Sequence, residues 1–288
     1  MMNARTVETH GVSIATEAFG DASHPAILLL MGAMASATWW PEGFCEQLAR
    51  RGRYVIRYDH RDTGRSTSSP PGQATYSSED LAWDAVGVLD GLGVASAHWV
   101  GMSLGGYLAQ MVAVAHPERV RTLTLIASEP LAPGEAPVPG IDPAVLAWHA
   151  QAATLDWSDR KAVLDYQVGA WRLLNGSAHA FAEAHIRELA TADYARTPNP
   201  LTAFNHATLR NLENWSGRMG EIQAPALIIH GTEDRVLPYA HALALHTALP
   251  GSQLLTLEGT GHELHPADWP VILDAIERHT AEGRGTAL

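Results

Sequence analysis

Several features that define whole classes of protein are scarce in this sequence. Cys45 is the single cysteine among 288 residues, which excludes an internal disulfide and a zinc site built from cysteines. Lysine and arginine together number 19, against 31 aspartates and glutamates, and the net charge is -12. A nucleic-acid binder needs a basic surface. The chain is therefore expected to bind no nucleic acid.

Long apolar runs are also missing. The longest, residues 26–35, is far shorter than the roughly 20 residues that a membrane-spanning helix needs. Residues 1–6 contain no apolar segment of the kind found in signal peptides. With 46% hydrophobic and 17% charged residues, the chain still has enough apolar content to bury one sizeable core. We therefore expect an acidic cytoplasmic protein that contacts no membrane.

Short apolar runs of strand length alternate with helical stretches, first up to residue 127 and again after Pro225. Residues 26–31 are continuously apolar, as expected for a strand buried on both faces. The predicted strands cover residues 6–19 (two strands about a turn at 10–11), 26–31, 54–58, 97–100, 120–127, 226–230 and 253–257; the predicted helices cover residues 44–51, 78–93 with Ser78 as N-cap, 104–116, 240–248 and a last one from 269. This alternation predicts an α/β fold with a mostly parallel, doubly wound sheet.

The alternation stops between residues 129 and 217. This stretch has helical patterns and several tryptophans, but no strand pattern. Because the strand rhythm resumes afterwards, a helical insertion after the sixth strand explains it better than a second sequential domain. We predict an α/β core from residues 1–128 and 217–288, with a helical cap, or lid, from residues 129–216.

The clearest chemical signal is Gly101-Met-Ser-Leu-Gly105. The pattern G-x-S-x-G is short, but here a predicted strand ends at Val100 and a predicted helix begins at Leu104, so Ser103 stands on a strand-to-helix turn. Such a turn holds the hydroxyl above the sheet at a helix N-terminus, where developing negative charge is favoured. We predict that Ser103 is a nucleophile; the alternative is a glycine-rich turn with a structural role only.

A serine hydroxyl becomes a good nucleophile when a histidine, oriented by a carboxylate, takes its proton. Asp234 follows the predicted strand at 226–230, and His262 follows the strand at 253–257 in a glycine-flanked loop. The carboxyl ends of parallel strands meet at one edge of a sheet, so both residues are expected near Ser103. The predicted triad is Ser103, His262 and Asp234.

Three other residues are rivals for the roles of base and acid. His265 lies close after His262, Glu233 is adjacent to Asp234, and Glu129 follows an earlier strand. Each stands on a predicted loop at the same sheet edge.

These residues resemble the α/β-hydrolase superfamily over essentially the whole chain. Residues 58–66, Tyr-Asp-His-Arg-Asp-Thr-Gly-Arg-Ser, are similar to the family's loop after the fourth strand; that loop is structural, so Asp59 and His60 receive no catalytic role. The resemblance implies an oxyanion hole formed by two backbone N–H groups, that of Leu104 and that of Ala33 in the loop after the third strand. It implies no cofactor and no metal.

Two features of the sequence indicate where this chain belongs within the superfamily. Many relatives have His-Gly where this chain has Met31-Gly32, so what anchors the loop is open. Met31-Gly32, Trp39-Trp40-Pro41 and residues 58–66 together look like a narrower group, the esterases of polyketide antibiotics. That group contains serine-dependent macrolide esterases and aclacinomycin methylesterases, and the compact cap resembles the former more.

The resemblance implies a small-molecule ester substrate, large and apolar. We expect opening of the lactone of a sixteen-membered macrolide, which inactivates the antibiotic; the alternative is hydrolysis of the methyl ester of an anthracycline-type polyketide. A carbon–carbon bond hydrolase or perhydrolase with the same triad, and a ligand-binding receptor on the same fold, stay open, as does the oligomeric state. Met34, Trp39, Trp40 and Met102 are expected to line the substrate pocket; the alternative is ordinary packing.

Overall fold

The computed structural model describes residues 2–131 and 138–282. Within these residues, eight strands form one sheet in the order β1-β2-β4-β3-β5-β6-β7-β8. The hairpin β1–β2 and the pair β2–β4 are antiparallel, and all other pairs are parallel. The strands are β1 (Asn3–Thr9), β2 (Val12–Phe19), β3 (Ala26–Leu30), β4 (Tyr54–Tyr58), β5 (Ala97–Met102), β6 (Val120–Ile126), β7 (Ala226–Gly231) and β8 (Gln253–Leu257). This sheet confirms the predicted α/β class.

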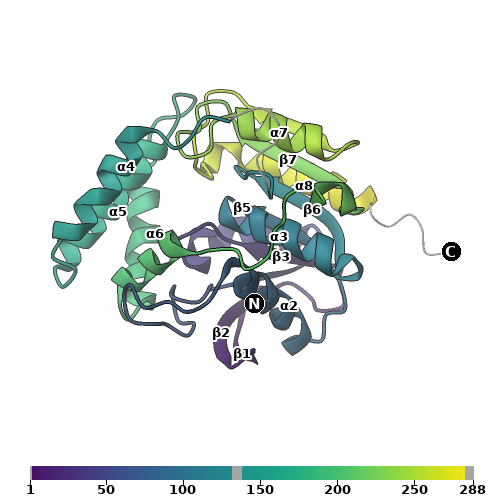
Figure 1. The fold of residues 1–288 in the computed structure, drawn as a ribbon, viewed down its shortest axis with the longest axis horizontal. Coiled ribbons are helices and arrows are strands. Elements are labelled where there is room, and N and C mark those ends of the chain that lie inside the picture. Colours follow the sequence, from purple (N-terminus) through teal and green to yellow (C-terminus); the bar gives the residue numbers. More distant parts are fainter. Residues whose placement is uncertain (1, 132–137, 283–288) are drawn as a thin grey trace.

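Helices cover both faces of the sheet (Figure 1). One face packs against α1 (Glu42–Arg50) and α8 (Trp269–Glu282), and the other packs against α2 (Ser78–Gly91), α3 (Leu104–Ala115) and α7 (Ala240–Ala248). Strands between two helical layers have no solvent-facing side, which explains why β3 is apolar at every position.

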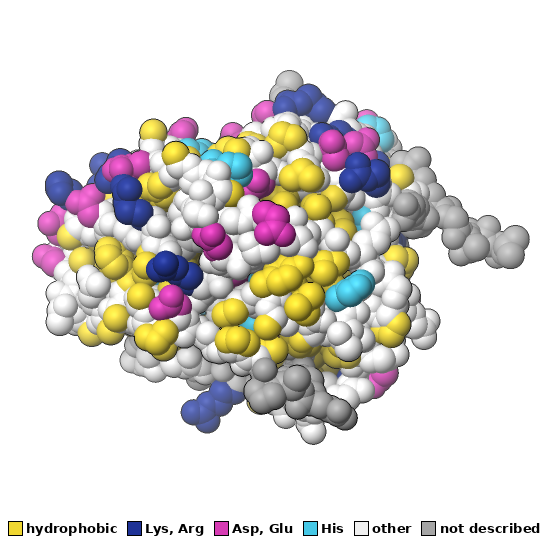
Figure 2. Space-filling model, turned by 90° about the horizontal axis from the view of Figure 1, so that it is seen from above, with side chains coloured by type: hydrophobic (Ala, Val, Ile, Leu, Met, Phe, Trp, Pro, Cys, Tyr) yellow, Lys and Arg dark blue, Asp and Glu magenta, His cyan; other side chains and the backbone are white. Residues whose placement is uncertain are grey.

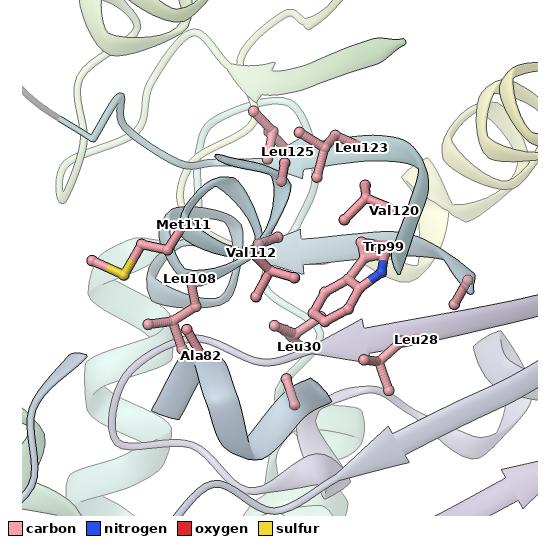
Figure 3. Close-up of a cluster of buried hydrophobic side chains, with 14 of the residues drawn as sticks. Leu28, Leu30, Ala82, Trp99, Leu108, Met111, Val112, Val120, Leu123 and Leu125 are labelled. Carbon is pink, nitrogen blue, oxygen red and sulfur yellow. The ribbon is translucent and has the colours of Figure 1, made fainter. Parts of the chain in front are cut away.

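The core on the α2–α3 side is centred on β5. Figure 3 shows Trp99 of β5 beside Leu28 and Leu30 of β3, with Leu108 and Val112 of α3 above the same strands. All five side chains are fully buried. Because α3 is packed between the sheet and α2, its sequence is apolar almost all round, and the turn that precedes it is held firmly in place.

Several element boundaries differ from the predictions by one to three residues; β1, for example, begins at Asn3 and α1 at Glu42. The N-cap of α2 is Ser77, not Ser78: Ser77 Oγ accepts the N–H of Asp80 at 3.1 Å, and the Asp80 carboxylate accepts the N–H of Ser77 at 2.8 Å. This reciprocal capping needs an acidic residue three places after the cap, and only Ser77 has one. Strand β5 runs on to Met102, beyond the predicted end at Val100, because its last residues still pair with β6.

Between β6 and β7 the chain is helical. The helices α4 (Pro143–Ala150), α5 (Arg160–Leu174) and α6 (Glu183–Arg196) stand together at one side of the sheet (Figure 1), and a 3₁₀ segment follows at Pro200–Thr208. No strand occurs among the described residues of this stretch. The division into a core and a cap at residues 129–216 stays a prediction, and residues 1, 132–137 and 283–288 lie outside the described residues.

The surface mixes charges of both signs. On the face that Figure 2 shows, basic side chains lie beside acidic ones at the left and the upper right, and apolar side chains gather between them. Across the described ranges, no helix is both long enough and apolar enough to cross a membrane.

Candidate active site

Ser103 stands on a sharp turn between β5 and α3, with a backbone φ of 52° and ψ of -119°. A positive φ is strained for a residue that has a side chain. The flanking glycines make room for the turn: a Cβ on Gly101 would lie 2.3 Å from the carbonyl oxygen of Gly105, and a Cβ on Gly105 would lie 2.2 Å from that of Leu30. Ser128 Oγ also donates to the carbonyl of Ser103 at 2.9 Å. The residues at 101–105 therefore form the strained turn that their motif predicts.

The predicted acid and base lie in direct contact. His262 Nδ1 is 2.6 Å from Asp234 Oδ2, and the other carboxylate oxygen, Oδ1, accepts the N–H groups of Val236 and Leu237, both at 2.8 Å. Burial by itself would raise the pKa of Asp234, but the adjacent imidazoles of His262 and His230 outweigh it and hold that pKa well below its usual range. The ionised carboxylate keeps the hydrogen of His262 on Nδ1, which leaves Nε2 able to accept a proton.

The three rival residues have other partners. Glu233 accepts hydrogen bonds from Ser177 N at 2.8 Å and from Ser177 Oγ at 2.6 Å. The Glu129 carboxylate lies 3.7 Å from His241. His265 caps the short 3₁₀ turn that follows it, where its Nδ1 accepts a backbone N–H at 3.1 Å. Among these candidates, only Asp234 and His262 meet.

Ser103 and His262 line one cavity between the sheet edge and α5. The Ser103 hydroxyl makes no hydrogen bond to any described residue, His262 included. Catalytic hydrogen bonds often tighten only when substrate is bound. Ser103 and His262 thus line the same cavity without a hydrogen bond between their side chains. Their role as a triad with Asp234 stays a prediction.

The loop after β3 passes directly beside the nucleophile. A Cβ on Gly32 would lie 3.3 Å from Ser103 Cβ, and Ala33 lines the same cavity as Ser103. Leu104 is the first residue of α3, where a backbone N–H has no partner within its own helix. The two amides of the predicted oxyanion hole therefore flank Ser103, and their function stays a prediction.

Three of the four predicted pocket residues line the cavity: Met34, Trp39 and Met102. Trp40 does not, and its prediction as a pocket residue is wrong. It is fully buried and packs against Phe44, with ring centroids 5.7 Å apart. Adjacent side chains on a tight turn point in different directions, so one tryptophan of the pair faces the cavity and the other fills the core.

Much of the remaining wall comes from the helical stretch between β6 and β7, including aromatic side chains that were not individually predicted as pocket residues. Trp171 stacks on Trp39 with ring centroids 4.6 Å apart, and Trp157 meets Phe204 edge-on at 5.4 Å. Tyr166 contributes to the same wall. Helical periodicity shows which face of a helix is apolar, but it does not show whether that face meets a neighbour or a cavity.

His230 is a further site residue without a clear sequence signal. It lies at the end of β7, where its Nε2 donates to Leu237 O at 2.7 Å and is 3.3 Å from Asp234 Oδ2. The one available clue is its position at the end of the strand that precedes Asp234. His230 therefore approaches the same carboxylate oxygen, Oδ2, that His262 contacts.

Other reactive groups are placed differently. Cys45 is buried on α1, and burial raises the pKa of its thiol to about 12, so it stays protonated and unreactive. In the part of the chain that the structure describes, no group of three or more His, Cys, Asp or Glu side chains is arranged to hold a metal ion.

The fold and this site place the chain in a known family. Residues 25–267 match the model of the α/β hydrolase fold family, and the chain belongs to that family, as its motifs predict. It is 34% identical to rhodomycin D methylesterase of Streptomyces peucetius over 97% of this chain and 98% of that protein. It is 31% identical to 2-hydroxymuconate semialdehyde hydrolase of Pseudomonas putida over 82% of this chain and 79% of that protein.

Solved structures show the same fold. The chain resembles 2-hydroxy-6-oxo-6-phenylhexa-2,4-dienoate hydrolase from Rhodococcus sp. strain RHA1 with a TM-score of 0.76 and 19% identity, covering 98% of this chain and 99% of that one. The match to the rhodomycin D methylesterases of two Streptomyces strains confirms the predicted class, a carboxylic-ester hydrolase. It also confirms the resemblance to esterases of polyketide antibiotics.

Proposed function

We propose that the chain hydrolyses the methyl ester of an anthracycline-type polyketide to the free acid and methanol. The observation that supports hydrolysis is the contact between Asp234 and His262. His262 lines the same cavity as Ser103, which stands on the strained turn. The similarity to rhodomycin D methylesterases supports a methyl ester as the substrate. The sequence by itself favours a macrolide lactone instead. The similarity to these methylesterases extends over almost the whole chain, including the helices that supply the cavity wall.

The aromatic wall supports a flat, apolar substrate. The stacked pair Trp39–Trp171 and the edge-on pair Trp157–Phe204 both line the cavity. Fused aromatic rings pack against such surfaces, and each aromatic pair adds about 0.5–1.5 kcal/mol beyond the burial of its area. Met34 and Met102 are flexible neighbours that adapt to the outline of a ligand.

In the proposed mechanism, Ser103 Oγ attacks the ester carbonyl carbon while His262 Nε2 takes its proton. Asp234 stabilises the imidazolium that forms. The N–H groups of Ala33 and Leu104 bind the oxyanion, and each contributes about 3 kcal/mol to the stability of the transition state. His262 then protonates the departing methoxide, and methanol leaves. Water attacks the acyl-enzyme with His262 again as base, which releases the acid and restores Ser103.

The test is mass spectrometry of an anthracycline methyl ester and of a sixteen-membered macrolide, each incubated with the protein in ¹⁸O-labelled water. We expect the anthracycline product to lose one methylene unit and to carry ¹⁸O in the new carboxylic acid, with no product from Ser103→Ala. Addition of water to the macrolide alone would replace the proposal by lactone opening.

Carbon–carbon bond hydrolysis is the second candidate, because a relative of that kind aligns over most of this chain. The same incubation with 2-hydroxymuconate semialdehyde tests it. Cleavage of that compound, with both esters left intact, would overturn the esterase proposal. Tight binding of the anthracycline without any turnover would instead favour a receptor.

A further inference from the structure

Two buried histidines outside the predicted triad hold the loop that carries the Ala33 N–H. Three successive peptide groups follow Met31, and the middle one contains that N–H. The peptide before it offers Met31 O to His60 Nε2 at 2.9 Å. The peptide after it donates Met34 N–H to His206 Nδ1 at 3.0 Å. The predicted oxyanion donor is thus flanked on both sides by a peptide group that an imidazole anchors.

The partners decide where each imidazole carries its hydrogen. A carbonyl oxygen only accepts, so Nε2 is the donor in His60 and also in His206, whose Nε2 lies 2.8 Å from Arg61 O. A backbone N–H only donates, so Nδ1 of His206 carries no hydrogen. The contacts therefore make the His206 ring neutral, whereas Nδ1 of His60 is buried without a hydrogen-bond partner among the described residues. Burial lowers the pKa of each, that of His60 to about 3, so neither ring gains a proton at neutral pH.

The loop has a reason to need this support. Met34 has a φ of 63°, in the left-handed region that costs a residue with a side chain on the order of 1 kcal/mol. A backbone in that conformation persists when its surroundings hold it there. His206 supplies one such hold, and it comes from the 3₁₀ segment Pro200–Thr208 that follows α6.

That segment is itself fastened to the loop after β4. Thr202 Oγ1 donates to Asp62 O at 2.9 Å, and Asn205 Nδ2 donates to Asp62 Oδ2 at 2.8 Å. His206 is buried beside them, with its ring centroid 6.1 Å from that of His60. The position of the His206 ring is therefore set by several contacts apart from its own bond to Met34.

We propose that His60 and His206 are positioning residues that hold the Ala33 N–H against Ser103, and that His206 makes the segment Pro200–Thr208 part of the oxyanion hole's support. This inference rests on the proposed function, because it presupposes ester hydrolysis at Ser103. The inference adds one requirement to the proposed function: the segment Pro200–Thr208 must be docked for hydrolysis to proceed. If the segment undocks, the Met34 N–H loses its acceptor, His206 Nδ1.

The two histidines use different ring nitrogens, and this allows a matched exchange experiment. An asparagine amide reaches the position of Nδ1, and a glutamine amide reaches the position of Nε2, because each is the same number of bonds from Cα. At position 206, His206→Asn keeps an acceptor for Met34 N–H and His206→Gln does not. At position 60 the order is reversed, since His60→Gln keeps a donor for Met31 O and His60→Asn does not.

We expect kcat on p-nitrophenyl acetate, a small activated ester, to fall by about 10²-fold in His206→Gln and His60→Asn, with KM changed less than about threefold. His206→Asn and His60→Gln should retain kcat within about fivefold. His279→Asn removes the same kind of bond, from His279 Nε2 to Leu123 O at 3.0 Å, away from the loop after β3 and from this segment, and should stay within about twofold. The affinity of a trifluoromethyl ketone, which forms an anionic tetrahedral adduct with serine, should fall in parallel with kcat/KM.

Melting temperatures of all variants establish that each is folded, and either pair alone is sufficient if a member of the other does not fold. Equal rates within each pair, or a loss in His279→Asn as large as that in His206→Gln, would overturn the inference. A wild-type protein that hydrolyses neither this ester nor the anthracycline would overturn the proposed function instead.

Discussion

Asp234, Glu129 and Glu233 are three carboxylates near the same sheet edge, and their neighbours give them different chemistry. Asp234 is buried, accepts two backbone N–H groups and contacts His262. Glu233 holds Ser177 through exposed contacts. Burial raises the pKa of Glu129, and the nearby His241 only partly offsets this. A carboxylate that orients the base must contact it, and of these three only Asp234 contacts His262.

Replacing Asp234 by asparagine should therefore lower kcat on the order of 10⁴-fold, because the amide no longer holds the hydrogen of His262 on Nδ1. Glu129→Gln is the matched control, since it makes the same chemical change next to a different histidine. We expect it to leave kcat unchanged. Steady-state kinetics on p-nitrophenyl acetate measure both. An inactive Glu129→Gln beside an active Asp234→Asn would show that Glu129 is the acid.

At the scale of elements, the turn from β5 to α3 depends on close packing of backbone against backbone. Gly105 lies against the carbonyl of Leu30, which belongs to the neighbouring strand β3. That contact brings α3 close to the sheet and places its N-terminus under Ser103. The strain at Ser103 is maintained by this packing, in which the helix and two strands leave no room for a relaxed turn.

Gly105→Ala should thus destabilise the protein by about 1–3 kcal/mol, because the new methyl group collides with backbone that is itself paired in the sheet. Activity should fall further than stability alone explains, since the collision shifts Ser103. Gly220→Ala is the control: a Cβ there meets nothing within 4 Å, so its effect should stay within about 0.5 kcal/mol. Urea unfolding and kinetics on the folded variants check both. Equal stability of the two variants would contradict the packing argument.

At the scale of the whole molecule, buried neutral histidines link folding to pH. Burial lowers the pKa of His60 from 6.5 to about 3 and also lowers that of His206. Below its ordinary pKa a histidine in the unfolded chain takes up a proton that the folded chain refuses. The unfolded state then binds more protons, and stability falls as the pH falls. Buried carboxyls whose pKa is raised, such as Asp59 and Asp193, act in the opposite sense, because their ionisation opposes folding as the pH rises.

For His60, this linkage should remove about 2 kcal/mol of stability between pH 8 and pH 5. His60→Gln keeps a hydrogen-bond donor and lacks the titrating group, so its free energy of unfolding should depend less on pH by that amount. Urea denaturation of both proteins at a series of pH values measures the difference, and all other titrating groups cancel in the comparison. Parallel curves for the two proteins would mean that His60 accepts a proton in the folded state.

Much of the fold could be read from the sequence, because the signals are local. The strand at 54–58 and the helix at 240–248 have the predicted bounds, since apolar periodicity and the flanking turn residues lie within a few positions of each element. The glycine-flanked turn at Ser103 is equally local. The order of elements and the hydrolase class follow from such features, and the comparisons with relatives agree with them.

Tertiary structure alone decided which residues meet. It placed Trp39 in the cavity and its neighbour Trp40 in the core, and it brought His206 to Met34 across 172 positions of the chain. No short pattern marks such pairs, because each depends on how the helices between β6 and β7 pack on the sheet edge. The sequence by itself determined the kind of catalytic groups present, while packing determined which of them face the cavity and what holds them there.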